Sequence, residues 1–230
     1  MYEVIYREEK STDYRVMPIR RPNIPAPEEN ATEIFIPGHG VILQKDGTYK
    51  PIVIPIEFNF MDVPDKWGEA YRKAKKWISG TGKLKFSDDP EYFYRVNLCK
   101  IVDPERISRQ IGIFTAEFTC DPYIYATAGQ TEKEIKDVLK NPYELCKPIY
   151  KITGNGSCTL TVNGKTMKAT VGQNLTIDTE RMLAYRESDG KLLNASVTGD
   201  YEDLYLKPGN NTISVTSGFT LKVIPNWRCL

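Results

Sequence analysis

The sequence predicts a mainly β protein of the α+β class, with one packed helix in its first half and a β-sandwich in its second half. Three observations support this class. Apolar and polar residues alternate along residues 114–120, only residues 65–79 carry a convincing helical stripe, and short strand-like segments recur about every ten residues after Pro148. At 230 residues the chain can hold one or two domains.

The stretch of residues 111–125, which contains a predicted strand, organises the first half. Its apolar face carries Phe114, Ala116, Phe118 and Cys120. Threonine and glutamate occupy the other face, so the strand should be half-buried and end at Asp121-Pro122, because proline has no amide hydrogen. We therefore divide the chain into a first domain (1–125), a linker with a short helix (126–147) and a second domain (148–230). The sequence leaves open whether residues 219–230 close the second domain or return to the first.

Short strands are predicted at residues 4–6, 14–16 and 34–36. Pro37-Gly38-His39-Gly40 reads as a turn, so the single histidine, His39, is interpreted as a turn residue and not as a catalyst. We expect strands at 41–43 and 50–61 to flank a turn at Asp46-Gly47. Strands at 83–86 and 92–101 should follow the helix, with turns at 87–90 and 103–106.

The helix is predicted from a stripe of apolar residues at helical spacing, namely Trp67, Ala70, Tyr71, Ala74, Trp77 and Ile78. Asp62 or Asp65 is available to cap its start, and Ser79-Gly80 should end it. The opposite face is basic and consists of Arg72, Lys73, Lys75 and Lys76. We interpret it as a solvated face, because no aromatic residues alternate with these charges.

Proline-rich segments of the first half are the candidates for contacts between subunits. The arm at residues 18–27 cannot satisfy its own backbone, and Pro51 and Pro55 disfavour a central position in a sheet for their strand. Such arms and edges are stable when a neighbouring copy covers them. The candidate assembly residues are Arg20, Arg21, Pro22, Pro25, Pro51, Pro55, Asp103 and Pro104.

After the boundary, residues 131–139 begin with a Thr-x-x-Glu box and predict a short helix that Asn141-Pro142 ends. Residues 157–162 then alternate as a strand, and Asn163-Gly164 is a strong hairpin signal. Further strands are expected at 167–171, 175–177, 183–185, 201–206, 212–215 and 219–224.

Composition argues against several classes of function. Residues 1–125 hold 18 basic and 19 acidic side chains and the remainder 13 and 11, so no strong field attracts nucleic acid or anionic membranes. No apolar run approaches the ~20 residues of a membrane span. Five cysteines without a CxxC pair predict reduced thiols. The chain has no GxGxxG, Walker, GxSxG or HExxH motif, so we expect no cofactor, no metal and no catalytic residues.

Several stretches along nearly the whole chain match the pattern of one known family. In the first half they are RRPNIPAP, IPGHG, DGTYK, IEFNF, LKFSDDPEYFY and FTAEFTCDPYIY. In the second half they are NPYELCKP, GNGSCTLTVNG, LTIDTE, YLKPGNNTISV and IPNWRCL. Their order and spacing resemble the distal tail (Dit) proteins of long-tailed bacteriophages with non-contractile tails.

This resemblance implies a structural protein and not an enzyme. Proteins of this family form a hexameric ring at the distal end of the tail, through an N-terminal ring-forming domain. A peripheral C-terminal β-sandwich resembles galectins or carbohydrate-binding modules. The implied partners are further copies of the chain, the tail tube protein, tail-tip, tail-associated lysin or fibre proteins, and cell-wall carbohydrate. The implied location is the tail tip of the virion, after assembly in the bacterial cytoplasm.

An alternative from another class is a carbohydrate-binding adhesion module of a tail or cell-surface apparatus. Aromatic side chains on a β-sandwich can stack on sugars, and the candidates here are Tyr185, Tyr201 and Tyr205. A tail-associated glycosidase or peptidase is a third alternative, which no sequence motif supports.

Overall fold

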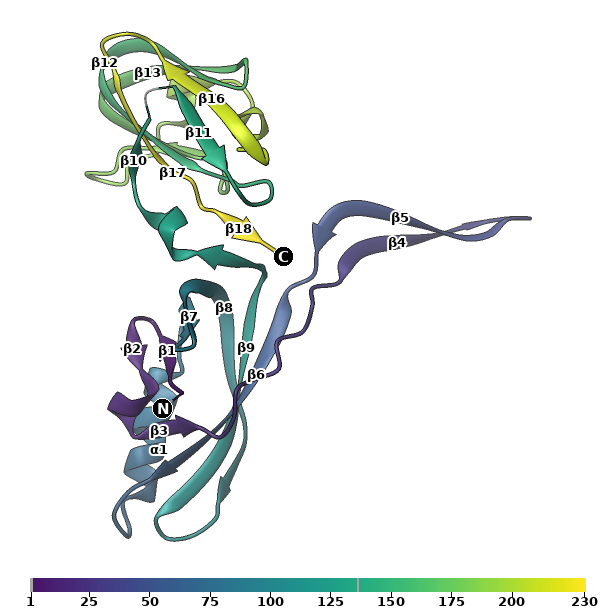
Figure 1. The fold of residues 1–230 in the computed structure, drawn as a ribbon, viewed down its shortest axis with the longest axis vertical. Helices are drawn as coiled ribbons and strands as arrows, with labels where there is room; N and C mark the ends of the chain where they lie inside the picture. The colour runs from purple at the N-terminus through teal and green to yellow at the C-terminus, as the bar shows by residue number, and fades with distance from the viewer. Residues whose placement is uncertain (1, 136) are drawn as a thin grey trace. The chain divides into compact units, whose positions relative to one another are not determined.

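The computed structural model describes residues 2–135 and 137–230, and of Asp103 only the backbone. The chain divides into two compact units, Met1–Ile124 with Leu230, and Tyr125–Cys229 (Figure 1). In the described residues the one α-helix, α1 (Trp67–Trp77), belongs to the first unit, and strands dominate both. The predicted mainly β class, with one packed helix in the first unit, is confirmed.

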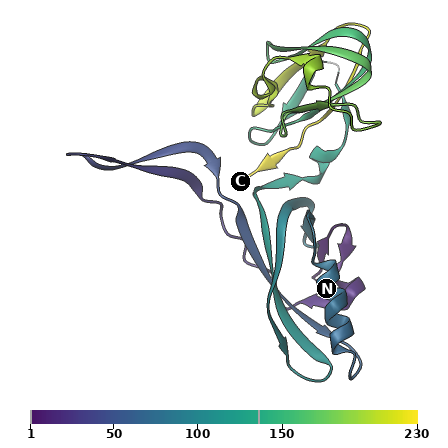
Figure 2. The same cartoon turned by 180° about the vertical axis from the view of Figure 1, so that it is seen from behind.

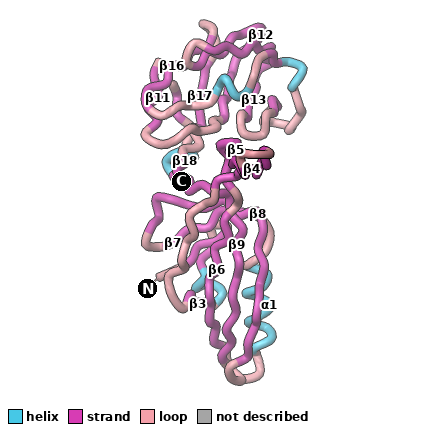
Figure 3. The backbone as a smooth tube through the Cα atoms, turned by 90° about the vertical axis from the view of Figure 1, so that its right-hand side faces the viewer, coloured by secondary structure: helices cyan, strands magenta, loops and turns pink. Residues whose placement is uncertain are grey.

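The first unit is built on one large sheet, in which the strand order is β2-β1-β7-β8-β9-β6-β3. Figure 3 shows its long strands β6, β8 and β9 running side by side. The strands are β1 (Val4–Tyr6), β2 (Glu9–Lys10), β3 (Val16–Pro18), β6 (Ile52–Met61), β7 (Gly82–Phe86), β8 (Asp89–Arg106) and β9 (Ile111–Ala126).

The central strand β9 carries the predicted core face. All four of its apolar residues named above, Phe114 to Cys120, are fully buried, and the facing residues Ile54, Ile56 and Phe58 of β6 are buried with them. The predicted end at Asp121-Pro122 is wrong, since β9 continues to Ala126. Pro122 is tolerated because the ladder with β6 ends at the pair Ile52 and Cys120, so its missing amide hydrogen breaks no bond to that strand.

Helix α1 lies along one face of this sheet (Figure 2). Ala70, Ala74 and Trp77 are buried on its apolar stripe, as predicted. The indole of Trp77 stacks on the Tyr14 ring at 5.6 Å and meets the Phe58 ring edge-on at 5.8 Å. The expected aspartate cap is wrong, because the N-cap position is Lys66 and makes no side-chain capping bond.

No hairpin turn forms at Asp46-Gly47, where one was expected. The turn is at residues 37–39, between β4 (Glu29–Ile36) and β5 (Gly40–Tyr49), and Asp46 lies within β5. There the Asp46 carboxylate accepts hydrogen bonds from the Thr48 amide and hydroxyl at 2.8 and 2.6 Å, and Gly47 has a φ of +74°. Residues 46–48 therefore form a β-bulge in β5, where the register with β4 shifts. Aspartate and glycine are common in bulges as well as in turns.

Two more local predictions in this unit are corrected. Tyr14 ends a short 3-10 helix, η1 (Ser11–Tyr14), and is not part of a strand. The turn expected at 103–106 is at 107–110, where the Ser108 hydroxyl accepts bonds from the Gln110 and Ile111 amides. Strand β8 can run through Pro104 because β7 pairs with it only between Asp89 and Val96.

The second unit encloses a separate core between its strands. Its two longest strands pair along their whole length, and the linking residues Asn163 and Gly164 have φ of 50° and 79°, which confirms the predicted hairpin. The strands are β10 (Lys133–Glu134), β11 (Val138–Asn141), β12 (Ile149–Val162), β13 (Lys165–Asp178), β14 (Leu183–Tyr185), β15 (Val197–Thr198), β16 (Gly209–Val215), β17 (Thr220–Ile224) and β18 (Arg228–Cys229). Its 3-10 helices are η2 (Thr127–Gln130), η3 (Asn194–Ser196) and η4 (Tyr201–Leu204).

The helix predicted at 131–139 is wrong. Its described residues form β10, which pairs with β17, and the start of β11, which pairs with β16. Lys136, within this range, lies outside the described residues. The edges of β16 and β17 supply backbone partners that outweigh the weak helical preference of a nine-residue segment. The strand expected at 201–206 is instead η4, whose Leu204 carbonyl accepts a bond from the buried Tyr150 hydroxyl at 2.7 Å.

The last two strands, β17 and β18, belong to different sheets. Strand β17 pairs with β12 and so closes the second unit's own sheet. Strand β18 pairs with β9, and the Ala126 amide donates to the Trp227 carbonyl at 3.0 Å.

Replacing Gly164 with alanine is expected to destabilise the second unit by ~1 kcal/mol, because its positive φ is strained for any residue with a Cβ atom. Gly172→Ala is the matched control. Its Cβ would meet open space, and its φ lies outside the left-handed region, so little change is expected. Urea unfolding of both variants measures the difference, and equal effects would contradict the left-handed turn.

Candidate assembly surface

The β4–β5 hairpin is the most exposed part of the first unit. It forms a two-stranded sheet of its own, and no other described strand pairs with it. Figure 1 shows β4 and β5 running out together, with no other element of the first unit beside them. Phe35 at its tip is 71% exposed, and Val41 and Leu43 are each 58% exposed. A two-stranded sheet in water is marginally stable, so this hairpin needs a covering surface.

The base of the hairpin is polar and its tip is apolar. At the base Lys45 pairs with Glu29 at 2.5 Å, and Lys50 pairs with Glu28 at 2.9 Å. The hydrogen bond from Lys50 lowers the pKa of Glu28, so the carboxylate stays charged. At the tip, the register pairs Phe35 with Val41 and Ile34 with Ile42 on opposite faces. Such a tip is suited to burial against another surface.

Three of the sequence-predicted assembly residues meet at a second feature. Arg20, Pro22 and Pro55 line a groove of about 260 Å³ together with Asn23, Glu57 and Thr115. This groove lies where β3 no longer covers β6, since β3 pairs only with residues 58–60. The segment 52–56 of β6 is therefore paired on one side only in the described structure. Pro55 lies in this half-paired segment, where a proline costs least.

The other predicted assembly residues are dispersed. Arg21 pairs with Asp88 at 2.6 Å, which ties the proline-rich arm to the turn before β8. Pro25 and Pro51 are exposed near the base of the hairpin, and Pro104 is exposed in β8. The side chain of Asp103 lies outside the described residues.

The sequence predicted two strands at 34–36 and 41–43 and the turn at Pro37-Gly38-His39-Gly40 between them, and the structure confirms all three. It did not predict that they form one long hairpin, because a second turn was expected at Asp46-Gly47.

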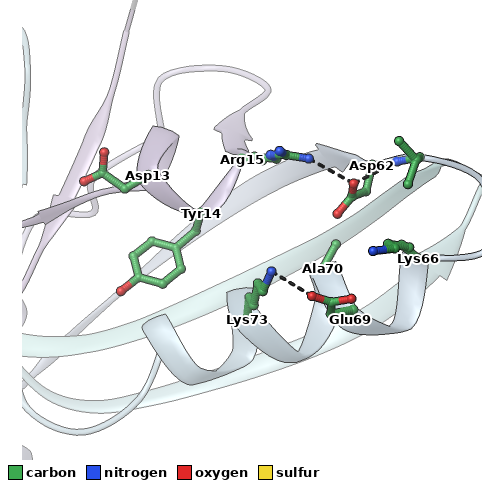
Figure 4. Close-up of a pocket in the computed structure, with 9 residues that line it drawn as sticks. Asp13, Tyr14, Arg15, Asp62, Lys66, Glu69, Ala70 and Lys73 are labelled. Atoms are coloured by element: carbon green, nitrogen blue, oxygen red, sulfur yellow. Dashed lines mark hydrogen bonds and ion pairs between the residues drawn. The ribbon is translucent and has the colours of Figure 1, made fainter.

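A charged cleft of about 480 Å³ separates η1 from the start of α1 (Figure 4). Four of its charged residues form two ion pairs: Arg15 contacts Asp62 at 2.9 Å, and Lys73 contacts Glu69 at 2.9 Å. The bond from Lys73 lowers the pKa of Glu69, which keeps this carboxylate ionised and unsuited to act as an acid. We interpret the cleft as a polar surface between two elements.

The candidate sugar-stacking tyrosines come from different elements of the second unit. Tyr185 lies in β14, and nearby Asp178 and Glu187 add to burial in raising its pKa. Tyr201 begins η4, with its hydroxyl buried and without a hydrogen-bond partner in the described structure. The Tyr205 ring has the Lys147 ammonium 5.5 Å from its centroid.

Three of the five cysteines, Cys120, Cys146 and Cys158, are buried. Burial raises the pKa of Cys120 to about 12, so it is a poor nucleophile. Among the described residues, no group of three or more His, Cys, Asp or Glu side chains could hold a metal ion. No helix in the described parts of the chain is long and apolar enough to cross a membrane.

The comparisons with known proteins agree with the fold. No family model and no curated protein matches the sequence. Among solved structures, the chain is similar to the Dit (gp 19.1) protein of phage SPP1, described as a paradigm of the hub adsorption apparatus in phages that infect Gram-positive bacteria. The TM-score is 0.66 at 15% identity, and the match covers 100% of both chains. From end to end, this chain therefore has the fold of the SPP1 Dit distal tail protein.

Proposed function

We propose that the protein is the distal tail hub of a long-tailed phage or prophage: a ring of identical subunits that joins the tail tube to the tail-tip or baseplate proteins. The observation that carries this proposal is the shared fold over the full length of both chains. A fold alone hosts many functions, so the proposal also draws on the assembly surface. The proposed role is structural and needs no catalytic residue, cofactor or metal.

The first unit is proposed to carry the assembly. It holds the unsupported hairpin and the half-paired segment of β6, and both are features that a neighbouring copy can cover. In a closed ring each copy gives one surface and receives another, so every exposed hairpin is covered in the same way. In the second unit the long strands pair along their full length around a core of their own.

The full-length protein is therefore expected to form a closed ring in solution, of six copies according to the family resemblance. Light scattering after size-exclusion chromatography gives the mass, and negative-stain imaging shows whether the particle is a ring. Antibodies against the chain should label the distal end of tails from the phage that encodes it. A monomer at micromolar concentration, or label along the whole tail, would contradict the proposal.

A further inference from the structure

An apolar groove lies at one end of the first unit's sheet, beside its edge strand β3. Its volume is about 450 Å³, and its apolar lining is Met17, Phe60, Met61 and Ile111, with Thr12, Arg15 and Asn59 beside them. Residues paired across strands share a face, and here Met17 pairs with Asn59 and Met61 with Ile111. Met61 is 64% exposed, so the groove is an uncovered apolar surface.

The tip of the β4–β5 hairpin complements this groove. One face of the hairpin carries Phe35, Val41 and Leu43, together with Glu33, because Phe35 pairs with Val41 and Glu33 with Leu43. The charged residue that lines the groove is Arg15. Its side chain is 69% exposed and forms one ion pair, with the carboxylate of Asp62. An apolar face with one acid therefore matches an apolar groove with one base.

We propose that the hairpin of one copy docks its Phe35, Val41 and Leu43 face into the Met17, Met61 and Ile111 groove of the next copy, with Glu33 beside Arg15. This inference rests on the proposed ring and names the two surfaces that close it. The contact is heterologous, since donor and acceptor surfaces differ, and repetition of such a contact generates a ring when the rotation closes.

The geometry of β6 favours a neighbouring copy over the chain's own hairpin. The hairpin joins β6 at Ile52, whereas the groove lies at Met61, and a ten-residue strand separates the two by roughly 30 Å. Docking within one chain would require the hairpin to fold back at Lys50-Pro51. There Pro51 restricts Lys50 to extended geometry, and the Lys50 amide donates to the Glu28 carbonyl at 2.8 Å.

Disulfide cross-linking between full-length variants tests the docking. One protein carries Val41→Cys and an affinity tag, and the other carries Met61→Cys and no tag. The two proteins are mixed, allowed to assemble and then oxidised with diamide. We expect a tagged-to-untagged cross-linked dimer, because a disulfide forms only between Cα atoms within about 7 Å. The control is Val138→Cys, which lies in β11 of the second unit, outside both proposed contact surfaces, and is 54% exposed. It should give no cross-link with Val41→Cys, and Val41→Cys alone reports the background from the native cysteines.

A second measurement does not depend on cysteine. Met61→Asp should weaken ring assembly by about tenfold or more, as expected when a charge enters an apolar contact, whereas Val138→Asp should leave it unchanged. A ring that persists in Met61→Asp, or a cross-link to Val138→Cys in place of Met61→Cys, would overturn the docking and leave the proposed ring intact. A cross-link within one chain in the Val41→Cys, Met61→Cys double variant would show self-docking and overturn it as well. A monomeric unmodified protein would overturn the ring itself.

Discussion

Shortening the β4–β5 hairpin is expected to convert the assembled protein into a monomer. Glu29 and Tyr49 are partners at the base of the hairpin, so residues 30–48 can be replaced by Asn-Gly, which forms a tight two-residue turn. The change removes the exposed apolar tip and leaves the first unit's core intact, because no hairpin residue belongs to that core. The mass in solution should fall from that of the ring to that of one chain.

Two substitutions show whether the effect belongs to the apolar tip. Phe35→Asp places a charge on the most exposed apolar side chain of the hairpin and should also abolish or strongly weaken the ring. Val138→Asp makes the same kind of change at an exposed position of β11 in the second unit and should leave the ring intact. Circular dichroism checks that each variant is folded. A shortened protein that still forms the ring would remove the hairpin from the interface.

Trp77→Ala is expected to destabilise the first unit by ~3–5 kcal/mol. Trp77 is 1% exposed and is one of the largest fully buried side chains. Its ring meets Tyr6, Tyr14 and Phe58, which come from β1, η1 and β6, so truncation leaves a cavity where three elements and the helix join. That loss is a large fraction of the stability of a typical domain.

The matched comparison is Trp67→Ala on the same helix stripe. Trp67 is only partly buried, against Phe60 and Tyr71, and its loss should cost less, about 1–3 kcal/mol. Urea unfolding followed by far-ultraviolet circular dichroism measures both variants, since removal of a tryptophan changes the fluorescence signal itself. A larger loss at Trp67 than at Trp77 would contradict the placement of the helix on the sheet.

The elements that the sequence predicted well are those with a repeated local pattern. Strand β9 alternates apolar and polar residues from Phe114 to Cys120, and a two-residue period leaves only one way to bury one face. The apolar stripe of α1 is equally restrictive, because its residues share a face only in a helix. Asn163-Gly164 predicted its hairpin because few other residue pairs adopt two consecutive positive φ angles.

The errors fall where local signals fit two structures. Asp46-Gly47 suits a turn or a bulge, and its position within β5 was decided by the pairing of β5 with β4. Residues 131–139 suit a short helix, yet the edges of β16 and β17 supplied partners that a single segment does not reveal. Of the assembly candidates, sequence indicated Arg20, Pro22 and Pro55, which the fold brings to one groove. The sequence did not identify the hairpin tip or the Met61 groove as candidates for contacts between subunits.

By itself, the sequence determined the mainly β class, the helix stripe and the core face of β9, because each depends on the spacing of residues within one segment. The tertiary structure alone decided which strands pair and which apolar residues remain uncovered. Phe35 and Phe114 are the same residue type in strand-like segments, but Phe114 is buried between neighbouring strands and Phe35 is exposed in a hairpin without them. Burial is a property of the neighbours that a segment finds, and those neighbours lie far away in the sequence.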